Sequence, residues 1–311
     1  MRKVFVKTLS ELAERDQRVM LLTGDLGFSL LEPYRDRFPR QFLNVGLSEQ
    51  TMLSMAAGMA LEGYHVFVYS IAPFIVCRAL EQIRNDLCYQ QLPVKLIGVG
   101  SGLAYGADGA THHAVDDLGI MTSLPDMIVL APGDPIETGM AVEASMGFDR
   151  PCYIRLNRSG DPIVHSLETA AGWTLGRPLQ ARGEENAAVA VMACGSTLPL
   201  ATEIYDELDR RGVSAHVLSV HTLKPVDVQH MRSLLSTSSL VVSLEDHCSQ
   251  NGLATLLRSW VPEARLFAAT LGDSFIHEVG STAYLRGRYG LERDALVTEI
   301  LGRLSLAEAG Q

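Results

Sequence analysis

Short apolar runs alternate with helical patterns along the first half of this 311-residue chain. The first run, Arg18–Thr23, reads as a buried strand that ends at Gly24-Asp25. Strands are predicted at residues 18–23, 41–44, 65–69, 94–99 and 127–130. Helices are predicted at residues 48–62, near 74–88 and near 134–146. This alternation implies right-handed strand–helix–strand crossovers and a mostly parallel sheet.

The pattern breaks from about Asn157, where Gly, Pro and polar residues are spread through the sequence. It resumes at Ala187 with a strand to Ala193 and an amphipathic helix over Leu198–Arg211. Further strands are predicted at residues 215–218 and 240–244. The predicted fold class is therefore α/β, with two three-layer α/β domains and mostly parallel sheets. The first domain is placed at residues 1–160, a linker at 161–186 and the second domain at 187–311.

The predicted helix at residues 48–62 has an unusual surface. It carries no charge between Thr51 and Leu61, and its apolar residues fall on more than one face. A helix that is apolar all round is buried on all sides. Burial against another subunit and burial at the centre of one domain both explain this pattern.

Composition narrows the class of protein. Hydrophobic residues make up 47% of the chain and charged residues 20%, which excludes a disordered chain. The net charge of −10 argues against non-specific binding to nucleic acid or to an anionic membrane, although a local Arg could still hold a phosphate. No apolar run approaches the roughly 18 residues of a membrane span, and no signal peptide is evident. The five cysteines form no Cys-x-x-Cys pair and are interpreted as core residues of a cytoplasmic protein.

Two stretches carry candidate chemistry. Residues 44–50 put Glu49 in the first turn of the predicted helix, where a carboxylate also simply favours the positive end of the helix dipole. Residues 106–114 form a Gly-rich loop that ends in the paired residues His112 and His113. Adjacent histidines rarely bind one ion, and no partner has suitable spacing, so no metal ligand is predicted.

Together these stretches resemble the transketolase family, in particular its pyrimidine-binding and C-terminal domains. The family's Gly-(Ile/Leu)-x-Glu-Gln motif and the small-residue helix after it match Gly46–Gly58. Its Asp-Gly-Pro-Thr-His-Gln loop matches Asp108–His113, and its Leu-Pro-x-x-x-Val-x-x-Pro-x-Asp segment matches Leu124–Asp134. Residues 222–225 and 245–247 look like the family's C-terminal domain, so the resemblance covers nearly all of the chain.

The resemblance implies a role for several residues in binding thiamine diphosphate and a sugar. Glu49 would be the carboxyl that hydrogen-bonds the ring nitrogen of the aminopyrimidine, where a dry pocket favours a protonated acid. Phe74 would be the aromatic wall against the pyrimidine, although a core Phe explains it equally well. His112, a catalytic candidate with Glu49, and Asp108 match positions that contact sugar hydroxyls or the reacting carbonyl oxygen.

Three further residues match positions that bind a substrate phosphate. Arg158 is the main candidate, and Ser29 and Arg2 match weaker positions; a loose terminal charge explains Arg2 nearly as well. Three departures from the family pattern leave the identity of the substrate open. Family members often have Pro in place of Ala110, Gln in place of His113 and, among phosphosugar transketolases, a substrate His in place of Gly100.

The family's diphosphate-binding motif is missing from this sequence. That motif is Gly-Asp-Gly with an Asn roughly 25–30 residues later, and it holds Mg²⁺ and the diphosphate. No Gly-Asp-Gly occurs in the chain, in which Gly24-Asp25, Gly133-Asp134 and Gly272-Asp273 are followed by other residues. The resemblance therefore implies one subunit of a split enzyme, paired with a Gly-Asp-Gly-containing subunit in a two-plus-two heterotetramer. Mg²⁺ would be bound mainly by the partner.

The predicted function is transfer of a two-carbon ketol unit from a ketose, expected to be phosphorylated, to an aldehyde acceptor. A beta-type subunit of a 2-oxo-acid dehydrogenase has the same domain order, and half of a deoxyxylulose-phosphate synthase-like carboligase also fits. An alternative of another class is a non-catalytic assembly subunit that keeps the fold. The presence of Glu49 and His112 argues against that alternative.

Overall fold

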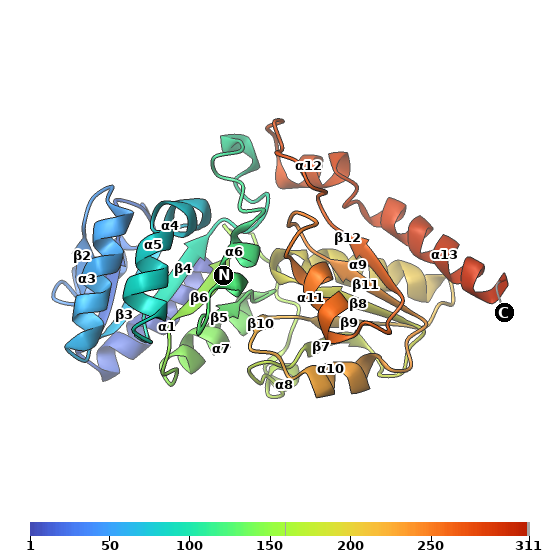
Figure 1. The fold of residues 1–311 in the computed structure, drawn as a ribbon, viewed down its shortest axis with the longest axis horizontal. Helices are drawn as coiled ribbons and strands as arrows, with labels where there is room; N and C mark the ends of the chain where they lie inside the picture. Colours follow the sequence, from blue (N-terminus) through green and yellow to red (C-terminus); the bar gives the residue numbers. More distant parts are fainter. Residues whose placement is uncertain (159, 310–311) are drawn as a thin grey trace.

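The computed structural model describes residues 1–158 and 160–309, which form two α/β units lying side by side (Figure 1). Each unit is built on a mostly parallel sheet covered by helices, as predicted. The first sheet has the strand order β10-β5-β6-β4-β3-β1-β2, and the second has the order β12-β11-β8-β9-β7. None of the helices described is long and apolar enough to cross a membrane.

The elements follow the predicted alternation closely. The strands of the first sheet are β1 (Val19–Thr23), β2 (Phe42–Asn44), β3 (His65–Ile71), β4 (Lys95–Val99), β5 (Ile128–Leu130), β6 (Cys152–Leu156) and β10 (Thr222–Lys224). Those of the second are β7 (Leu179–Gly183), β8 (Val189–Ala193), β9 (Ala215–Ser219), β11 (Leu240–Leu244) and β12 (Leu266–Ala269). The α-helices are α1 (Arg2–Arg15), α2 (Glu32–Arg37), α3 (Glu49–Leu61), α4 (Ala72–Arg78), α5 (Leu80–Gln82), α6 (Asp117–Ser123), α7 (Pro135–Ser145), α8 (Leu167–Ala170), α9 (Leu198–Arg210), α10 (Val228–Leu235), α11 (Leu253–Trp260), α12 (Thr282–Arg288) and α13 (Arg293–Ala309).

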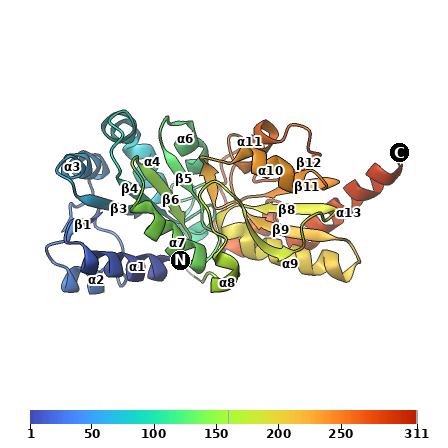
Figure 2. The ribbon, with the colours of Figure 1, turned by 90° about the horizontal axis from the view of Figure 1, so that it is seen from below.

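Helices cover both faces of the first sheet, which is why its strands are continuous apolar runs. On one face, α1 and α7 pack together and bury Phe5 and Leu9 against residues such as Leu21. On the other face, α3, α4 and α6 bury Met52, Ile75 and their neighbours (Figure 2). The amphipathic α1 is absent from the sequence predictions, although its buried residues are spaced at helical intervals.

The long helix predicted near residues 74–88 is broken in the structure. It consists of α4, the short α5 and a π-helical turn at Ile83–Cys88. Ile75 and Val76 of α4 and Ile83 of the π-helical turn are buried against the sheet, whereas α5 between them has no fully buried residue. The hydrophobic pattern reports this buried side but does not reveal the changes in helical hydrogen bonding along it.

The structure contains two strands, β7 and β10, that the sequence analysis did not assign, and β10 connects the two units. The predicted linker at 161–186 contains α8 and also β7, which pairs antiparallel with β9 at the edge of the second sheet. Strand β10 follows β9 in the chain but pairs antiparallel with β5 at the edge of the first sheet. The second sheet therefore begins inside the predicted linker, and the first sheet is completed by a strand from the later half of the chain.

Three of the five cysteines, Cys88, Cys152 and Cys194, are buried as predicted for core residues. Cys77 is exposed and Cys248 is half-buried, so the core interpretation is wrong for Cys77. All five are free thiols. Burial raises the pKa of Cys88 to about 11, which keeps this thiol protonated at neutral pH.

Candidate functional site

The candidate site lies at the carboxyl ends of the parallel strands of the first sheet. Ser29 follows β1, Glu49 follows β2, Phe74 follows β3 and Arg158 follows β6. The loop between β4 and α6 carries Asp108 and His112. Open α/β sheets bind their ligands at this edge, and the topology therefore gathers residues that are far apart in the sequence.

Glu49 is the first residue of α3 and is only 3% exposed. The turn before it depends on Gly46, whose φ of +72° is in the left-handed region that glycine adopts readily. The Glu49 Oε1 atom accepts a hydrogen bond from Arg78 Nη1 at 3.1 Å. A small open pocket is lined by these two residues together with Leu47, Ser48 and Gln50. A buried carboxylate thus faces a space that is open to a ligand.

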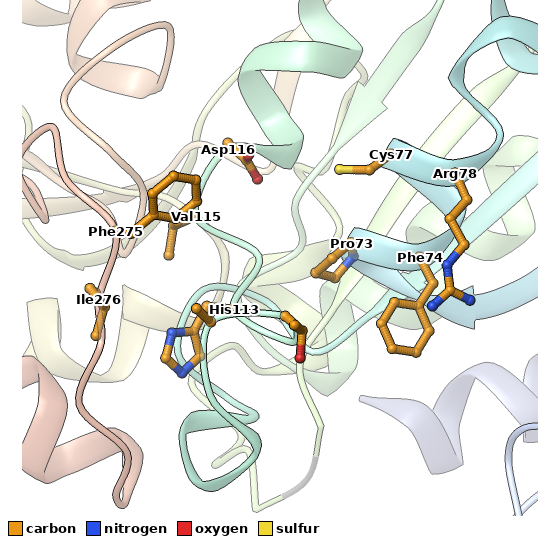
Figure 3. Close-up of a pocket in the computed structure, with 11 residues that line it drawn as sticks. Pro73, Phe74, Cys77, Arg78, His113, Val115, Asp116, Phe275 and Ile276 are labelled. Atoms are coloured by element: carbon orange, nitrogen blue, oxygen red, sulfur yellow. The ribbon is translucent and has the colours of Figure 1, made fainter.

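Arg78 connects Glu49 to the aromatic residues of the site. Phe74 and Arg78 are one helical turn apart on α4, and the guanidinium lies 4.2 Å from the centre of the Phe74 ring. Figure 3 shows the Arg78 side chain folded alongside that ring. The His112 ring meets the other side of this group, with its centroid 5.0 Å from that of Phe74 in an edge-to-face arrangement. The structure therefore connects Glu49 to Phe74 and His112 through Arg78.

A cavity of about 390 Å³ adjoins Phe74 between the two units (Figure 3). Its first-unit lining includes Cys77, His113 and Asp116, and Phe275 and Ile276 line it from the second unit. His113 is 4% exposed, and neither of its ring nitrogens has a hydrogen-bond partner within the described residues. Burial lowers the pKa of His113, so the ring is neutral at neutral pH. Burial raises the pKa of Asp116, and the neighbouring charge of Asp117 adds to this shift.

A second group of residues, which we call the basic corner, consists of Arg2, Tyr105, Asp108 and Arg158. The Arg158 guanidinium lies 4.8 Å from the centre of the Tyr105 ring, and Arg158 Nη1 lies 3.9 Å from Asp108 Oδ2. Arg2 donates a hydrogen bond through its Nε to the carbonyl oxygen of Arg158. The Tyr105 ring is also 5.9 Å from the His112 ring, so the basic corner adjoins the Phe74 group.

Ser29 is the one predicted site residue that the structure does not join to these groups. Its backbone N–H donates to Glu32 Oε1 at 2.9 Å, and its φ is +60°. Within the described residues, no hydrogen bond or ion pair connects Ser29 to the basic corner. Arg2, in contrast, is held at the corner and is not a loose terminal charge.

The second unit holds the loop that carries Tyr105, Asp108 and His112. The carbonyl oxygen of Gly106 accepts a hydrogen bond from the Gly280 N–H at 3.1 Å. The carbonyl oxygen of Leu103 accepts one from Thr282 Oγ1 at 3.0 Å. Figure 1 shows this loop rising beside α12. The position of the candidate site residues thus depends on both units.

One cluster of metal-binding residue types occurs within the described residues, away from the site. Asp134, Glu137 and His165 are fully buried, and His165 Nδ1 is 3.3 Å from Asp134 Oδ2. Asp134 caps α7 by accepting the Glu137 N–H, and it also accepts the N–H groups of Val164 and His165. These bonds to the backbone give the cluster a structural role in attaching residues 164–165 to α7.

Family models identify both units of the chain. Residues 1–161 match the pyrimidine binding domain of transketolase, and residues 180–281 match the transketolase C-terminal domain. The chain belongs to the transketolase family. Both domains that the sequence resemblance pointed to are therefore present and in the predicted order.

Transketolase relatives match this chain over almost its whole length. One subunit of the apulose-4-phosphate transketolase of Phocaeicola vulgatus is 31% identical over 95% of this chain and 94% of its own. A putative transketolase C-terminal section of Methanocaldococcus jannaschii is 31% identical over 97% of this chain and 95% of its own. Among solved structures, a split gene transketolase described as an inactive beta4 tetramer superposes with a TM-score of 0.86, at 29% identity and 98% coverage of both chains. The match to a split transketolase is therefore a match of whole chains.

Two side chains of this transketolase site are absent from the sequence predictions. Arg78 lies four positions after Phe74 on α4. Helical side chains at this spacing meet, so the contact of Arg78 with the ring follows from the helix. Tyr105 lies in the loop before Asp108, and no local pattern indicates that it contacts Arg158. That contact depends on how two loops from different strands come together.

Proposed function

We propose that this chain is the pyrimidine-side subunit of a split, thiamine-diphosphate-dependent transketolase. Together with a diphosphate-binding subunit, it would transfer a two-carbon ketol unit from a phosphorylated ketose to an aldehyde. The main support is the position of Glu49, a carboxylate buried at an open pocket and paired with Arg78, which in turn contacts Phe74 beside His112. The names of the split-chain relatives support the same function.

The residues at this pocket fit the pyrimidine half of thiamine diphosphate. Glu49 lines one open pocket, where it would meet a ring nitrogen, and Phe74 lines the adjacent one, where its apolar face suits a flat heterocycle. When bound, the cofactor supplies the nucleophilic carbon that attacks the ketose carbonyl, and the protein supplies binding, orientation and electrostatics. The chain's own contribution is therefore a positioned acid and an aromatic wall.

The ion pair between Glu49 and Arg78 bears on whether Glu49 can donate a hydrogen bond to the cofactor. A carboxylate held by a guanidinium accepts hydrogen bonds, whereas a carboxyl that donates to a ring nitrogen must carry a proton. Arg78 is half-exposed, with 53% of its side chain accessible, and can move away when a heterocycle occupies the pocket. We propose that the Glu49–Arg78 pair opens when the cofactor binds.

Substrate contacts are assigned to the neighbouring loop and the basic corner. His112 lies beside Phe74, where its ring can donate a hydrogen bond to an oxygen that gains negative charge. Asp108 can accept from sugar hydroxyls. Arg158, with Arg2 attached to its carbonyl oxygen, provides a cationic end for a sugar phosphate. Ser29 is a weaker candidate for binding that phosphate.

Two observations support the proposal of a partner subunit. Its sequence lacks the Gly-Asp-Gly motif expected to hold Mg²⁺ and the diphosphate. A solved split transketolase that matches this chain end to end is described as an inactive tetramer of beta chains. We propose a two-plus-two assembly in which the partner binds the metal and the diphosphate.

The test is reconstitution with a Gly-Asp-Gly-containing chain encoded beside this one. Ketol transfer from a ketose phosphate is measured with thiamine diphosphate and Mg²⁺ for this chain alone, for the partner alone and for the mixture. We expect activity in the mixture only. Turnover by this chain alone would refute the split-subunit proposal, and turnover of pyruvate in place of the ketose would favour the dehydrogenase or synthase alternative.

A further inference from the structure

Tyr105 occupies a position in the basic corner that depends on the absence of a side chain at residue 100. Gly100 has a φ of +95°, and a Cβ atom built on it would overlap the Tyr105 ring. Only glycine combines this backbone conformation with such a close approach. The Tyr105 ring consequently lies directly on the backbone at the end of β4, where it is half-buried.

The ring contacts two residues of the proposed substrate site. The His112 ring lies 5.9 Å from it between centroids, and the Arg158 guanidinium lies 4.8 Å from its centre. The charges of Arg2 and Arg158 both act on the Tyr105 phenol, whose pKa is nevertheless raised by burial. Tyr105 therefore contacts both His112, at the proposed reacting end of the site, and Arg158, at its cationic end.

Arg158 has two competing neighbours in the basic corner. The Tyr105 ring attracts its guanidinium through a cation–π contact, and Asp108 attracts it as an ion pair at 3.9 Å. A guanidinium neutralised by a carboxylate is less available to an anionic ligand. The Arg158–Asp108 pair is a long one, and 47% of the Arg158 side chain is open to solvent, so the guanidinium is accessible to an anionic ligand.

We propose that Tyr105 is a specificity-determining residue that holds Arg158 ready for a phosphate-bearing substrate. This inference rests on the proposed transketolase function and adds to it a residue that sets how well Arg158 recognises the phosphate. Tyr105 acts through Arg158, so it is a positioning residue. Its removal should weaken recognition of the phosphate and leave the reacting end of the site unchanged.

The experiment compares Tyr105→Leu with wild type in the reconstituted enzyme, using one ketose in its phosphorylated and unphosphorylated forms. We expect KM for the phosphorylated form to rise about two- to five-fold, the range of an exposed cation–π contact. We expect kcat and the KM of the unphosphorylated form to stay within twofold of wild type. Inorganic phosphate, used as a competitive inhibitor, should bind more weakly to the variant by the same factor.

Two variants act as controls for this comparison, and a third tests whether Tyr105 acts through Arg158. Tyr105→Phe keeps the ring and should behave like wild type, which assigns the effect to the ring rather than to the hydroxyl. Tyr89→Leu makes the same replacement at a tyrosine that is 83% exposed and outside the site, and it should change neither KM. Arg158→Met removes the cation that the ring contacts, so Tyr105→Leu should have little further effect in that background.

The outcomes separate this inference from the proposed function. If the wild-type mixture shows no ketol transfer, the proposed function fails. If the wild type is active and Tyr105→Leu affects both forms of the ketose equally, or affects neither, the role of Tyr105 is refuted. A Tyr105→Leu effect that persists unchanged in the Arg158→Met background would also refute it, because the ring would then act without a cation at residue 158.

Discussion

Glu49, Arg78, Phe74, His112 and Tyr105 form a continuous row of side chains that leads to Arg158. The contacts in the row are an ion pair, aromatic pairs and cation–π contacts. These contacts depend on orientation, because rings and guanidinium groups are planar. The row offers a ligand a carboxylate at one end and a cation at the other.

The first residue-scale prediction concerns Glu49. We expect Glu49→Gln to lower kcat of the reconstituted enzyme by at least about 100-fold, because the amide keeps the shape but cannot exchange a proton. Steady-state ketol transfer measures this effect, and co-elution with the partner checks assembly. Glu62→Gln, at the exposed C-terminal end of the same helix, is the matched control. Unchanged activity of Glu49→Gln would favour the non-catalytic assembly subunit.

Sequence alone accounts for part of this row and not for the rest. Glu49, Phe74 and His112 lie in contiguous motifs, so their meeting at one sheet edge follows from the motifs and the strand order. The contact between Tyr105 and Arg158 joins loops after β4 and β6, and it requires the backbone conformation of Gly100. Such contacts arise from tertiary packing, which leaves no periodic trace in a sequence.

At the scale of elements, the N-terminal cap of α7 is part of a larger buried polar cluster. Asp134 caps the helix, and Glu137 Oε2 accepts hydrogen bonds from the Gly133 N–H and from Ser219 Oγ. His165 lies beside both carboxyl groups. This buried cluster joins α7 to β9 of the second sheet and to the segment after β6. Sequence analysis predicted the helix near residues 134–146 but not the polar cluster at its start.

The cluster predicts a specific dependence of stability on pH. Burial raises the pKa of Glu137 from about 4.5 to about 7, and bonds to Asp134 and the charge of Glu137 raise the pKa of His165 above its usual value. Both groups bind protons more tightly in the folded chain, so the stability they contribute is lost as pH rises. The pKa of Asp134 is lowered, which acts in the opposite sense only under more acidic conditions.

We therefore expect wild type to lose about 3 kcal/mol of unfolding free energy relative to Glu137→Gln between pH 5 and pH 8. The amide stays neutral throughout and keeps an acceptor for Gly133 and Ser219. Urea unfolding at four pH values in this range measures the difference. A difference that stays constant with pH would show that Glu137 ionises normally in the folded chain.

At the scale of the whole molecule, one hydrophobic cluster spans the two units. The cluster that contains Met52 and Val129 of the first unit continues without a break to Met192 and Leu257 of the second. Buried charges cross the same boundary. Arg155 on β6 pairs with Asp117 at 3.1 Å and with Asp246 of the second unit at 3.5 Å, and Asp246 also pairs with Arg286 at 2.6 Å.

This network makes Asp246 a sensitive position. We expect Asp246→Ala to destabilise the chain by about 3–5 kcal/mol, because it leaves the buried Arg155 with less compensation for its charge. Asp149→Ala, which removes an 81% exposed partner of Arg150, should cost less than about 1 kcal/mol. Urea unfolding of both variants makes the comparison. Equal effects would mean that solvent reaches the Asp246 pairs and screens them.

The prediction of two mostly parallel α/β domains is confirmed at this scale, because alternating strands and helices determine the class of fold. The pairing of β10 with the first sheet is not predictable in the same way. Thr222–Lys224 is a short segment that could extend either sheet, and its pairing with β5 is decided by the packing of the two units.

The position of β10 has a consequence for how the chain is made. A ribosome that has released residues 1–160 has delivered six strands of the first sheet, but the edge of β5 stays open until Thr222–Lys224 emerges. Domains that finish folding one after another during synthesis do not have this dependence. For this protein, the amino-terminal domain is completed by residues translated more than sixty codons after its own last strand.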